Sequence, residues 1–373
     1  MQDYLKHYEV NIQVLSPMHI GSGEKIGKKE YIYMPGKHQV IVPDLIKMYT
    51  DIQKKGLGRE YEKYMMYTTQ KGPSLSQWLK QQGFNSGDFV KWKQYEMDAG
   101  EAFVTQTAKP KEIDAFIKDA YGQPYVPGSS IKGMIRTALI AWKLYNQPER
   151  YATVQQEIWK RSAVQENRKN CLARETKQLE QAVLYTLSRD EKKSGNAVND
   201  CLSGMHVGDS DPIGIEKLTL GQKIDYTLDG TEKPLPLLRE CLMPGTEIRC
   251  ELSIDTTLCP YTVEDIMEAL NYLQSVAYTS FYSRFKRGSR EKDIIWLGGG
   301  CGFLSKTIIY PMFGERGVKV TDNIFRNTLG RQYEQHKHAK DLRLKLAPHV
   351  CKCTRFRGSL YDMGMGRISF REA

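Results

Sequence analysis

One stretch near the middle of the chain, YVPGSSIKGMIRTALIAWKLY at residues 125–145, constrains the fold more than any other. Pro127 and Gly128 make a turn, and the apolar residues after it recur at the spacing of a helix with one buried face. A serine next to the turn, Ser129 or Ser130, is expected to cap this helix. The predicted buried face consists of Ile131, Ile135, Leu139 and Trp142.

Two cations lie near the start of the same helix. Lys132 and Arg136 are four residues apart, so they share the opposite face. Positive charges at that end oppose the helix dipole, and a bound anion would compensate them. The small residues before them leave room for a phosphate to reach the unpaired N–H groups of the first turn. An ordinary cap with solvated cations explains this pattern equally well when it is taken alone.

Alternating residues predict strands near both ends of the chain. In the stretch 8–14, apolar and polar residues alternate, and 245–255 shows the same period. A period of two indicates a strand with one buried and one wet face. Further predictions are a short strand leading into a helix at 38–49, a helix at 262–281 capped by Thr262, and a short apolar strand at 293–297.

Each half of the chain therefore offers strands, a glycine-rich loop and a packed helix, which resembles two copies of the β-α-β-β-α-β plan. The stretch between the halves is polar, charged and helical in character, which is typical of an insertion with a linker. We predict an α+β fold of two ferredoxin-like (RRM-like) domains packed together, with helical insertions. The expected boundaries are 1–146 for the N-terminal domain, 147–200 for the helical insertion and linker, and 201–373 for the C-terminal domain.

The charge balance favours a polyanionic partner. The chain has 54 basic and 44 acidic residues and a formal net charge of +10, which suits nucleic acid, although a lysine-rich surface alone would give the same balance. Eight scattered cysteines and the polar opening sequence indicate a reduced, cytoplasmic protein. No apolar run is long enough for a membrane span, so we expect no membrane contact.

Four glycine-rich loops are the candidate binding elements, because glycine lets the backbone approach a ligand closely. The loop that contains Ser305, Lys306 and Thr307 nearly matches a nucleotide-binding P-loop. However, Ser305 stands where that motif has glycine, and too few residues follow for the parallel strands of such a domain, so a cradle for RNA phosphates is favoured. The four loops are PMHIGSG (17–23), PGSSIKG (127–133), LGGGCGFLSKT (297–307) and GSLYDMGMGRISF (358–370).

Basic and aromatic residues interleave after the predicted helix at 262–281. Four cations could contact phosphates there, while the aromatic residues either stack on bases or complete the core beside the helix. We favour the core interpretation for at least two of the three aromatic residues. The cations are Arg284, Lys286, Arg287 and Arg290, and the aromatic residues are Phe281, Tyr282 and Phe285.

Catalytic and metal sites are less well supported. His19 could bond a phosphate or act as a general base in RNA cleavage, but no acidic or second histidine partner is evident, so binding is favoured. His349, Cys351 and Cys353 would share one face of a strand, which suggests zinc. Their spacing lacks the usual CxxC form and a fourth ligand, so buried free cysteines are favoured. We predict no metal, no cofactor and no catalytic residue.

The first three of these loops, in this order, resemble motifs of the RAMP superfamily of CRISPR effector proteins. The combination is most similar to the subunit that caps one end of the type III-A (Csm) effector complex. The resemblance implies a protein that binds the 3′ portion of CRISPR RNA, ends the filament of backbone subunits and supports maturation of that RNA's 3′ end. The implied partners are CRISPR RNA, the backbone RAMP subunit, the small subunit and host exonucleases.

Two hypotheses about function follow. The first is a non-catalytic RNA-binding cap, and the alternative is a metal-independent endoribonuclease that processes precursor CRISPR RNA. The second would need a base, an acid and a cation around the cut, and only cations are plentiful. The candidate RNA-binding residues are His19, Gly21, Ser22, Gly23, Ser129, Ser130, Lys132, Arg136, Arg284, Lys286, Arg287, Arg290, Gly299, Gly300, Gly302, Ser305 and Lys306.

Overall fold

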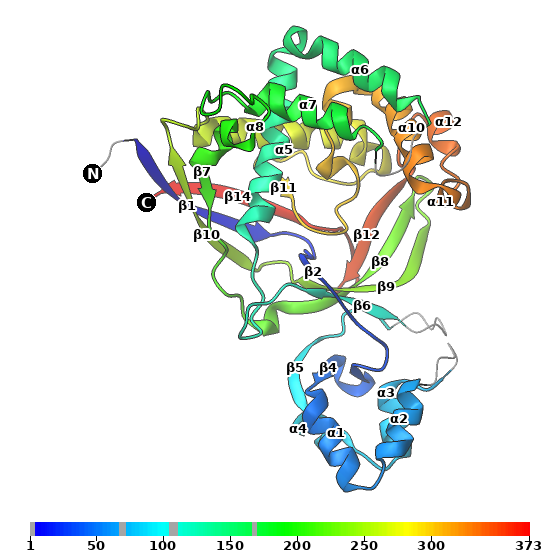
Figure 1. The fold of residues 1–373 in the computed structure, drawn as a ribbon. Coiled ribbons are helices and arrows are strands. Elements are labelled where there is room, and N and C mark those ends of the chain that lie inside the picture. The colour runs from blue at the N-terminus through cyan, green and yellow to red at the C-terminus, as the bar shows by residue number, and fades with distance from the viewer. Residues whose placement is uncertain (1–3, 67–71, 104–110, 166–169) are drawn as a thin grey trace.

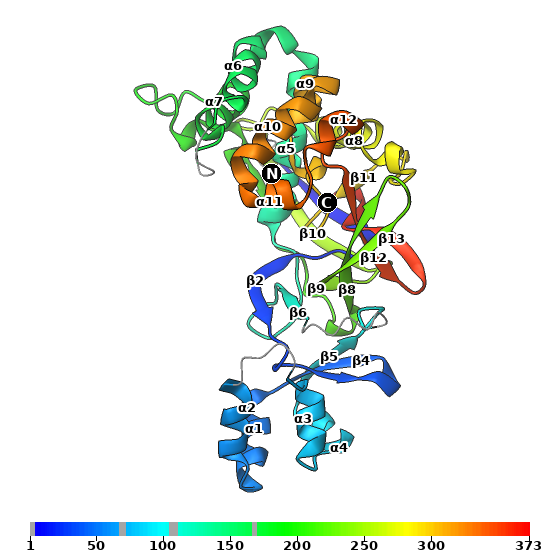
Figure 2. The same cartoon turned by 90° about the vertical axis from the view of Figure 1, so that its right-hand side faces the viewer.

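The computed structural model describes residues 4–66, 72–103, 111–165 and 170–373. Two curled β-sheets occupy the middle of the molecule, and a mixed α+β fold results (Figure 1). Most helices lie on one side of the sheets, and a smaller helical lobe projects from the opposite side. The same arrangement is seen after a quarter turn (Figure 2).

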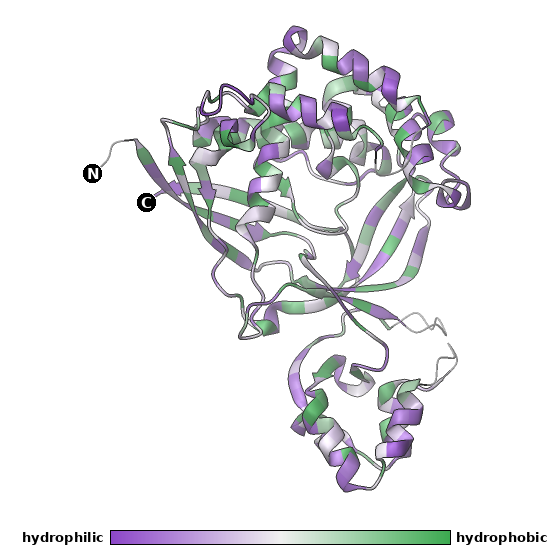
Figure 3. Ribbon diagram, viewed as in Figure 1, coloured by the Kyte–Doolittle hydropathy of each residue, from purple (hydrophilic) through white to green (hydrophobic). Residues whose placement is uncertain are grey.

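The first sheet joins the two ends of the chain. Its five strands run in the order β11-β14-β1-β10-β7, and every neighbouring pair is antiparallel. The predicted alternation is confirmed in β1, where Val10, Ile12 and Val14 are buried. Apolar and polar residues alternate along the sheet strands in Figure 3. The strands are β1 (Leu5–Val14), β7 (Met205–Val207), β10 (Glu247–Asp255), β11 (Ile294–Trp296) and β14 (Met365–Glu372).

Two long helices connect these strands. α5 lies between β1 and β7 along the chain, α8 lies between β10 and β14, and the two helices pack against each other. Thr262 caps α8 as predicted, through a reciprocal capping box with Asp265. The predicted serine cap of α5 is wrong, because the helix already begins at Gly128 and Pro127 supplies no side-chain cap. The helices are α5 (Gly128–Asn146) and α8 (Val263–Ser280).

The second sheet has nine strands. Its main path is β2-β6-β9-β8-β5-β4-β3, and β12 extends it from β8 with β13 beside it. The β6–β9 and β5–β8 pairs are parallel, while the other pairs are antiparallel. The strands are β2 (Gly21–Ile26), β3 (Ile32–Met34), β4 (Gln39–Pro43), β5 (Lys93–Asp98), β6 (Glu112–Phe116), β8 (Leu218–Thr227), β9 (Glu232–Leu242), β12 (Val350–Phe356) and β13 (Ser359–Asp362).

The small lobe has its own apolar core. Trp78, Phe89 and Trp92 are buried there together with residues of β3 and β4. The predicted strand followed by a helix at 38–49 is confirmed by β4 and α1. The lobe's helices are α1 (Leu45–Lys54), α2 (Gly58–Met66), α3 (Leu75–Gln81) and α4 (Ser86–Lys91).

Helices also fill the stretch between the halves and the region before β12. The side-chain amide of the buried Asn199 donates to the carbonyl groups of Asp190, Lys193 and Ser194, which ties the end of the stretch 147–200 to itself. Each sheet contains strands that precede residue 147 in the sequence and strands that follow residue 200. The three domain boundaries stay a prediction. These helices are α6 (Ala152–Ser162), α7 (Ala173–Leu184), α9 (Ile309–Phe313), α10 (Gly317–Leu329), α11 (Arg331–Gln335) and α12 (Lys340–Leu344).

Among the described residues, none of the helices is long and apolar enough to cross a membrane. The most apolar positions of α5 and α8 face the shared core instead.

Candidate nucleic-acid interface

His19 lies where the chain passes from the first sheet to the second, and it joins two of the glycine-rich loops. Its backbone carbonyl accepts the N–H of Gly299 at 2.7 Å. A Cβ at Gly298 would lie 2.2 Å from that carbonyl oxygen, and one at Gly299 would lie 2.9 Å from the imidazole Cδ2. The loops 17–23 and 297–307 therefore lie side by side, and only glycine at 298 and 299 permits so close a contact with His19.

The His19 ring is fixed and neutral. Only 4% of the residue is exposed, and its Nδ1 lies 2.7 Å from the carbonyl oxygen of Glu240. Because a carbonyl only accepts, Nδ1 must carry the proton in this contact. Burial lowers the pKa of His19 despite this hydrogen bond, which leaves Nε2 as an acceptor in the neutral ring.

The loop 358–370 meets the same two loops. The N–H of Gly364 donates to the carbonyl of Pro17 at 2.9 Å, and its own carbonyl accepts the N–H of Leu297 at 2.8 Å. A Cβ at Gly364 would lie 2.3 Å from the sulfur of Cys301. Three of the four loops singled out in the sequence therefore converge, although they are far apart along the chain.

The fourth loop, 127–133, is connected to this junction through backbone hydrogen bonds. Ile117 donates to the carbonyl of Ile20 at 2.8 Å, and Tyr125, just before the loop, donates to Ile117 at 3.4 Å. The first N–H of the helix, from Gly128, already has a carboxylate acceptor in Asp209 at 2.8 Å. The start of α5 is thus packed against the chain after β7.

The two cations of α5 have partners within the protein. Lys132 Nζ donates to the carbonyl oxygens of Leu202 and Met205 at 2.8 and 2.7 Å, and burial lowers the pKa of Lys132. Arg136 forms an ion pair with Asp200 at 2.6 Å. These contacts tie α5 to residues 200–205, where β7 begins, and an RNA contact of either side chain stays a prediction.

The aromatic residues after α8 belong to the core. Phe281, Tyr282 and Phe285 are 3%, 2% and 4% exposed, so the core interpretation is confirmed for all three. The ring of Tyr282 stacks on Trp296 with a centroid distance of 4.4 Å. No base could stack on these buried rings.

The cations interleaved with those rings divide into two groups. Arg287 forms an ion pair with Asp362 and donates to the carbonyl of Leu360 at 2.8 Å. Arg284 and Arg290 are exposed. Lys286 is exposed as well, in a left-handed backbone conformation. Arg284 donates to the carbonyl of Leu344 at 3.3 Å, and Arg290 donates to the Tyr278 hydroxyl at 3.0 Å.

The remaining predicted residues differ in exposure. Gly21, Ser22 and Gly23 are exposed on β2, and the Ser22 hydroxyl donates to the carbonyl of Ala115 at 3.3 Å. Lys306 is exposed, whereas Ser305 is buried and donates its hydroxyl to the carbonyl of Gly302 at 3.1 Å. The others are Ser129, which is exposed, and Ser130, Gly299, Gly300 and Gly302, which are partly exposed.

A buried carboxylate beside His19 was missed by the sequence analysis. Glu240 is 0% exposed and accepts hydrogen bonds from the Tyr95 hydroxyl at 2.7 Å and the Phe116 N–H at 2.8 Å. It also forms an ion pair with Lys118. The charged residues Arg239 and Glu240 between Leu238 and Cys241 in β9 were the signal that could have revealed it. The hydrogen bonds of Glu240 hold β5, β6 and the loop that contains His19 together.

Cations on the second sheet were missed as well. Arg239 pairs with Asp114 at 3.6 Å, and its Nη1 is buried without a hydrogen-bond partner among the described residues. Burial lowers the pKa of Lys223, and the positive charges of Lys352 and Arg239 lower it further. Arg239 also lowers the pKa of His19, so it lies near the loop junction, and Lys352 is paired with Asp225 at 2.6 Å. We refer to Arg239, Lys223 and Lys352 as the sheet cations.

The geometry combines the exposed backbone of Gly21 and Gly23, the exposed Lys306 and the sheet cations with a buried, neutral imidazole beneath them. Such a surface can receive the phosphates of a ribose-phosphate chain through backbone N–H groups and fixed positive charge. A family model described as RAMP superfamily matches residues 11–305. The chain belongs to the RAMP superfamily.

Named relatives in the RAMP superfamily agree with this result. A Mycobacterium tuberculosis protein named CRISPR system Cms protein Csm5 is 30% identical over all of both chains. A Streptococcus thermophilus protein of the same name is 26% identical and covers 100% of this chain and 99% of its own. The resemblance drawn from the loop motifs is thereby confirmed.

Two solved structures share this RAMP fold. The crystal structure of T. onnurineus Csm5 is 18% identical, with a TM-score of 0.62 over 96% of this chain and 99% of that chain. A chain of the cryo-EM structure of a Csm-crRNA-target RNA ternary complex in a type III-A CRISPR-Cas system is also 18% identical. Its TM-score is 0.58 over 97% of this chain and 100% of that chain.

Proposed function

We propose that this RAMP protein binds CRISPR RNA, caps the 3′ end of a type III-A effector ribonucleoprotein and supports maturation of the RNA's 3′ end. The observation that carries the proposal is the junction of three glycine-rich loops at His19, next to the sheet cations. The names of the relatives support the assignment to this assembly, and so does the likeness of the fold to a chain of the Csm-crRNA-target RNA complex.

We propose further that the protein binds RNA without cleaving it. A general base must reach the proton that it removes, and only 4% of His19 is exposed. The nearby Glu240 carboxylate is 0% exposed and is already occupied by Tyr95, Phe116 and Lys118, so it cannot reach a proton of the RNA. The alternative, a metal-independent endoribonuclease, predicts a defined product from repeat RNA that persists in EDTA and disappears in a His19→Ala variant.

The proposed partners are CRISPR RNA, the backbone RAMP subunit, the small subunit of the Csm complex and host exonucleases, in the cytoplasm. Copurification from the native host tests this set. Small RNAs of uniform length together with several partner proteins would support a cap within an assembly. A protein that purifies alone and free of RNA would contradict it.

We also propose that the first sheet with α5 and α8 is one ferredoxin-like unit. Its elements follow the chain order β1-α5-β7-β10-α8-β14, and four of its strands lie side by side in the order β14-β1-β10-β7. A β-α-β-β-α-β succession with antiparallel strands is the pattern of that fold. The loop junction at His19 lies just after β1, the first strand of the unit.

Salt-dependent RNA binding tests the interface. Fluorescence anisotropy with labelled single-stranded repeat RNA should give a Kd that rises steeply with NaCl, because bound cations displace counterions. For a single strand, each lost phosphate contact reduces the slope of log K against log[salt] by about 0.7. Lys306→Ala and Lys223→Ala should each weaken binding and reduce the slope by about this amount.

Lys80→Ala is the matched control, because Lys80 is an exposed lysine on α3 in the small lobe, away from the loop junction. This control should keep the slope of the parent protein. Equal slopes for all three variants and the parent would contradict an interface at the loop junction.

A further inference from the structure

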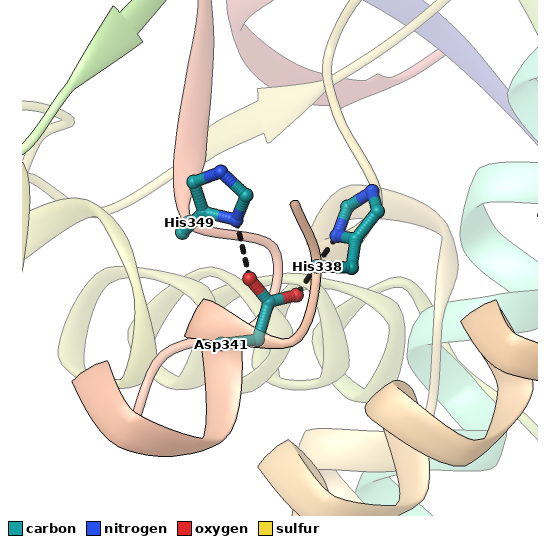
Figure 4. A group of neighbouring side chains, drawn as sticks. All are labelled: His338, Asp341 and His349. Carbon is teal, nitrogen blue, oxygen red and sulfur yellow. Dashed lines mark hydrogen bonds and ion pairs between the residues drawn. The ribbon is translucent and has the colours of Figure 1, made fainter. Parts of the chain in front are cut away.

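A cluster of two imidazoles and a carboxylate lies outside the proposed RNA interface. His338 precedes α12, Asp341 belongs to α12, and His349 lies just before β12 (Figure 4). The Nδ1 of His338 is 3.0 Å from one Asp341 oxygen, and the Nδ1 of His349 contacts the other oxygen. All three potential ligand atoms lie within 4.8 Å of one another.

Asp341 has an incomplete charge balance. It is 0% exposed, and the ionisable partners that contact its carboxylate among the described residues are the two histidines. The nearby Asp322 is equally buried but has a permanent cation, Arg326, at 3.1 Å. A carboxylate out of water needs a positive charge nearby. No arginine or lysine among the described residues pairs with Asp341, and a bound metal cation would supply that charge.

We propose that His338, Asp341 and His349 bind a divalent transition-metal ion, with zinc as the expected metal. Two imidazole nitrogens and one carboxylate oxygen form a ligand set that suits Zn²⁺. Ca²⁺ and Mg²⁺ prefer shells made of oxygen atoms, so the two histidines argue against them. Three protein ligands leave one position of a tetrahedral shell, which a water molecule can fill.

The geometry requires only a small adjustment. Ligand atoms about 2.0–2.1 Å from a tetrahedral zinc are about 3.4 Å apart. The ligand atoms now lie within 4.8 Å of one another, so no pair needs to approach by more than about 1.4 Å. Rotation of one imidazole would bring them that much closer. His349 is partly exposed, so its ring has room to turn and gives the ion a path from solvent.

The neighbouring thiols belong to a different group. Cys351 and Cys353 lie 3.6 and 3.5 Å from an Asp362 oxygen, and Asp362 is already paired with Arg287. The two thiols and Asp362 therefore form a cluster of their own. The zinc site therefore uses His349 without the cysteines that follow it in the sequence.

A bound ion would connect α12 to β12 directly. Its ligands span residues 338–349, so it would close the segment that leads from the helices into the second sheet. Binding to the folded state alone raises stability in proportion to the logarithm of free metal over Kd. The predicted role is structural support of β12, the strand that carries Lys352.

Metal analysis of the full-length protein tests the proposal. The protein is purified without a histidine tag, exposed to excess zinc and then exhaustively dialysed. Inductively coupled plasma mass spectrometry should find about one zinc per chain, because three ligands and a water complete one shell. Addition of a chelator should lower the melting temperature, and returning zinc should restore it.

Three variants separate ligand loss from general damage. His349→Gln and Asp341→Asn should each reduce zinc affinity by about 100-fold or more, since even partners of ligands cost about 10–100-fold. His336→Ala is the control, because the exposed His336 ring lies beside His338 but outside the cluster. It should retain the zinc and the chelator response of the parent.

Circular dichroism and size-exclusion chromatography identify variants that fail to fold. If Asp341→Asn fails to fold, zinc titration of His349→Gln, whose partly exposed side chain is easier to replace, decides. A parent protein with less than about 0.1 zinc per chain, against the one shell expected, would overturn the proposal. Zinc binding by folded His349→Gln as tight as in the parent would overturn it too.

Discussion

Replacing Glu240 by alanine should destabilise the protein more than almost any other single change near the loop junction. The carboxylate is 0% exposed and accepts hydrogen bonds from Tyr95, Phe116 and Lys118. Glu240→Ala removes all three acceptor contacts, leaves the Phe116 N–H without its partner and leaves the Lys118 ammonium uncompensated. Breaking a buried ion pair from one side costs about 3–5 kcal/mol, and an orphaned buried donor about 1–3 kcal/mol.

These contributions overlap, and the Lys118 side chain is 16% exposed, so water can relieve part of the cost. We expect a loss of about 4 kcal/mol in the free energy of unfolding. Urea unfolding followed by tryptophan fluorescence and circular dichroism measures it. Glu240→Gln keeps the volume and one acceptor, so it should lose about half as much.

The matched control is Glu112→Ala. Glu112 is also one partner of an ion pair on this sheet, with Lys25, but both side chains are more than half exposed. Exposed pairs contribute little, so the urea midpoint of this variant should stay close to that of the parent. If Glu240→Ala shifts the midpoint no more than Glu112→Ala does, the reasoning about the buried anchor is refuted.

Three further predictions concern the same region. Gly298→Ala, at φ +88° and facing the His19 carbonyl, should cost about 1–3 kcal/mol in a thermal melt, and an unchanged melt contradicts the strain. Lys132→Met removes the ammonium donor from the carbonyls of Leu202 and Met205, so urea unfolding should show a loss of about 1–3 kcal/mol, whereas a solvated lysine would give none. Burial lowers the pKa of His19, so below pH 6.5 the unfolded chain binds more protons than the native state, and the protein loses stability as the pH falls. His19→Asn should make the urea midpoint less dependent on pH in this range.

Elements whose signal is local were predictable from the sequence. The alternation in β1 and β10 and the helical period of α5 and α8 each depend on neighbouring residues, and each was found as expected. The cap of Thr262 on α8 is local as well, since its partner Asp265 lies three residues on. The start of α5 was different, because the carboxylate that accepts from Gly128 lies 81 residues away in Asp209.

The candidate site shows the same division. Glycine-rich loops were recognisable as places where backbone must come close, but only the fold reveals that three of them meet at His19. Lys132 and Arg136 looked like free cations, while their partners, such as Asp200 and Glu180, are 44 or more residues away. Glu240 follows Arg239 in β9, and its role depends on Tyr95 and Lys118, which no spacing rule connects with it.

The position of the RNA is the central claim, and photo-crosslinking measures it directly. A CRISPR RNA with 4-thiouridine at single positions near its 3′ end is bound to the protein, irradiated and digested, and the crosslinked peptides are identified by mass spectrometry. The account predicts crosslinks in the loops 17–23 and 297–307 and on the strands that carry Lys223 and Arg239. Crosslinks confined to the small lobe of α1 to α4, with none at the loop junction, would contradict it.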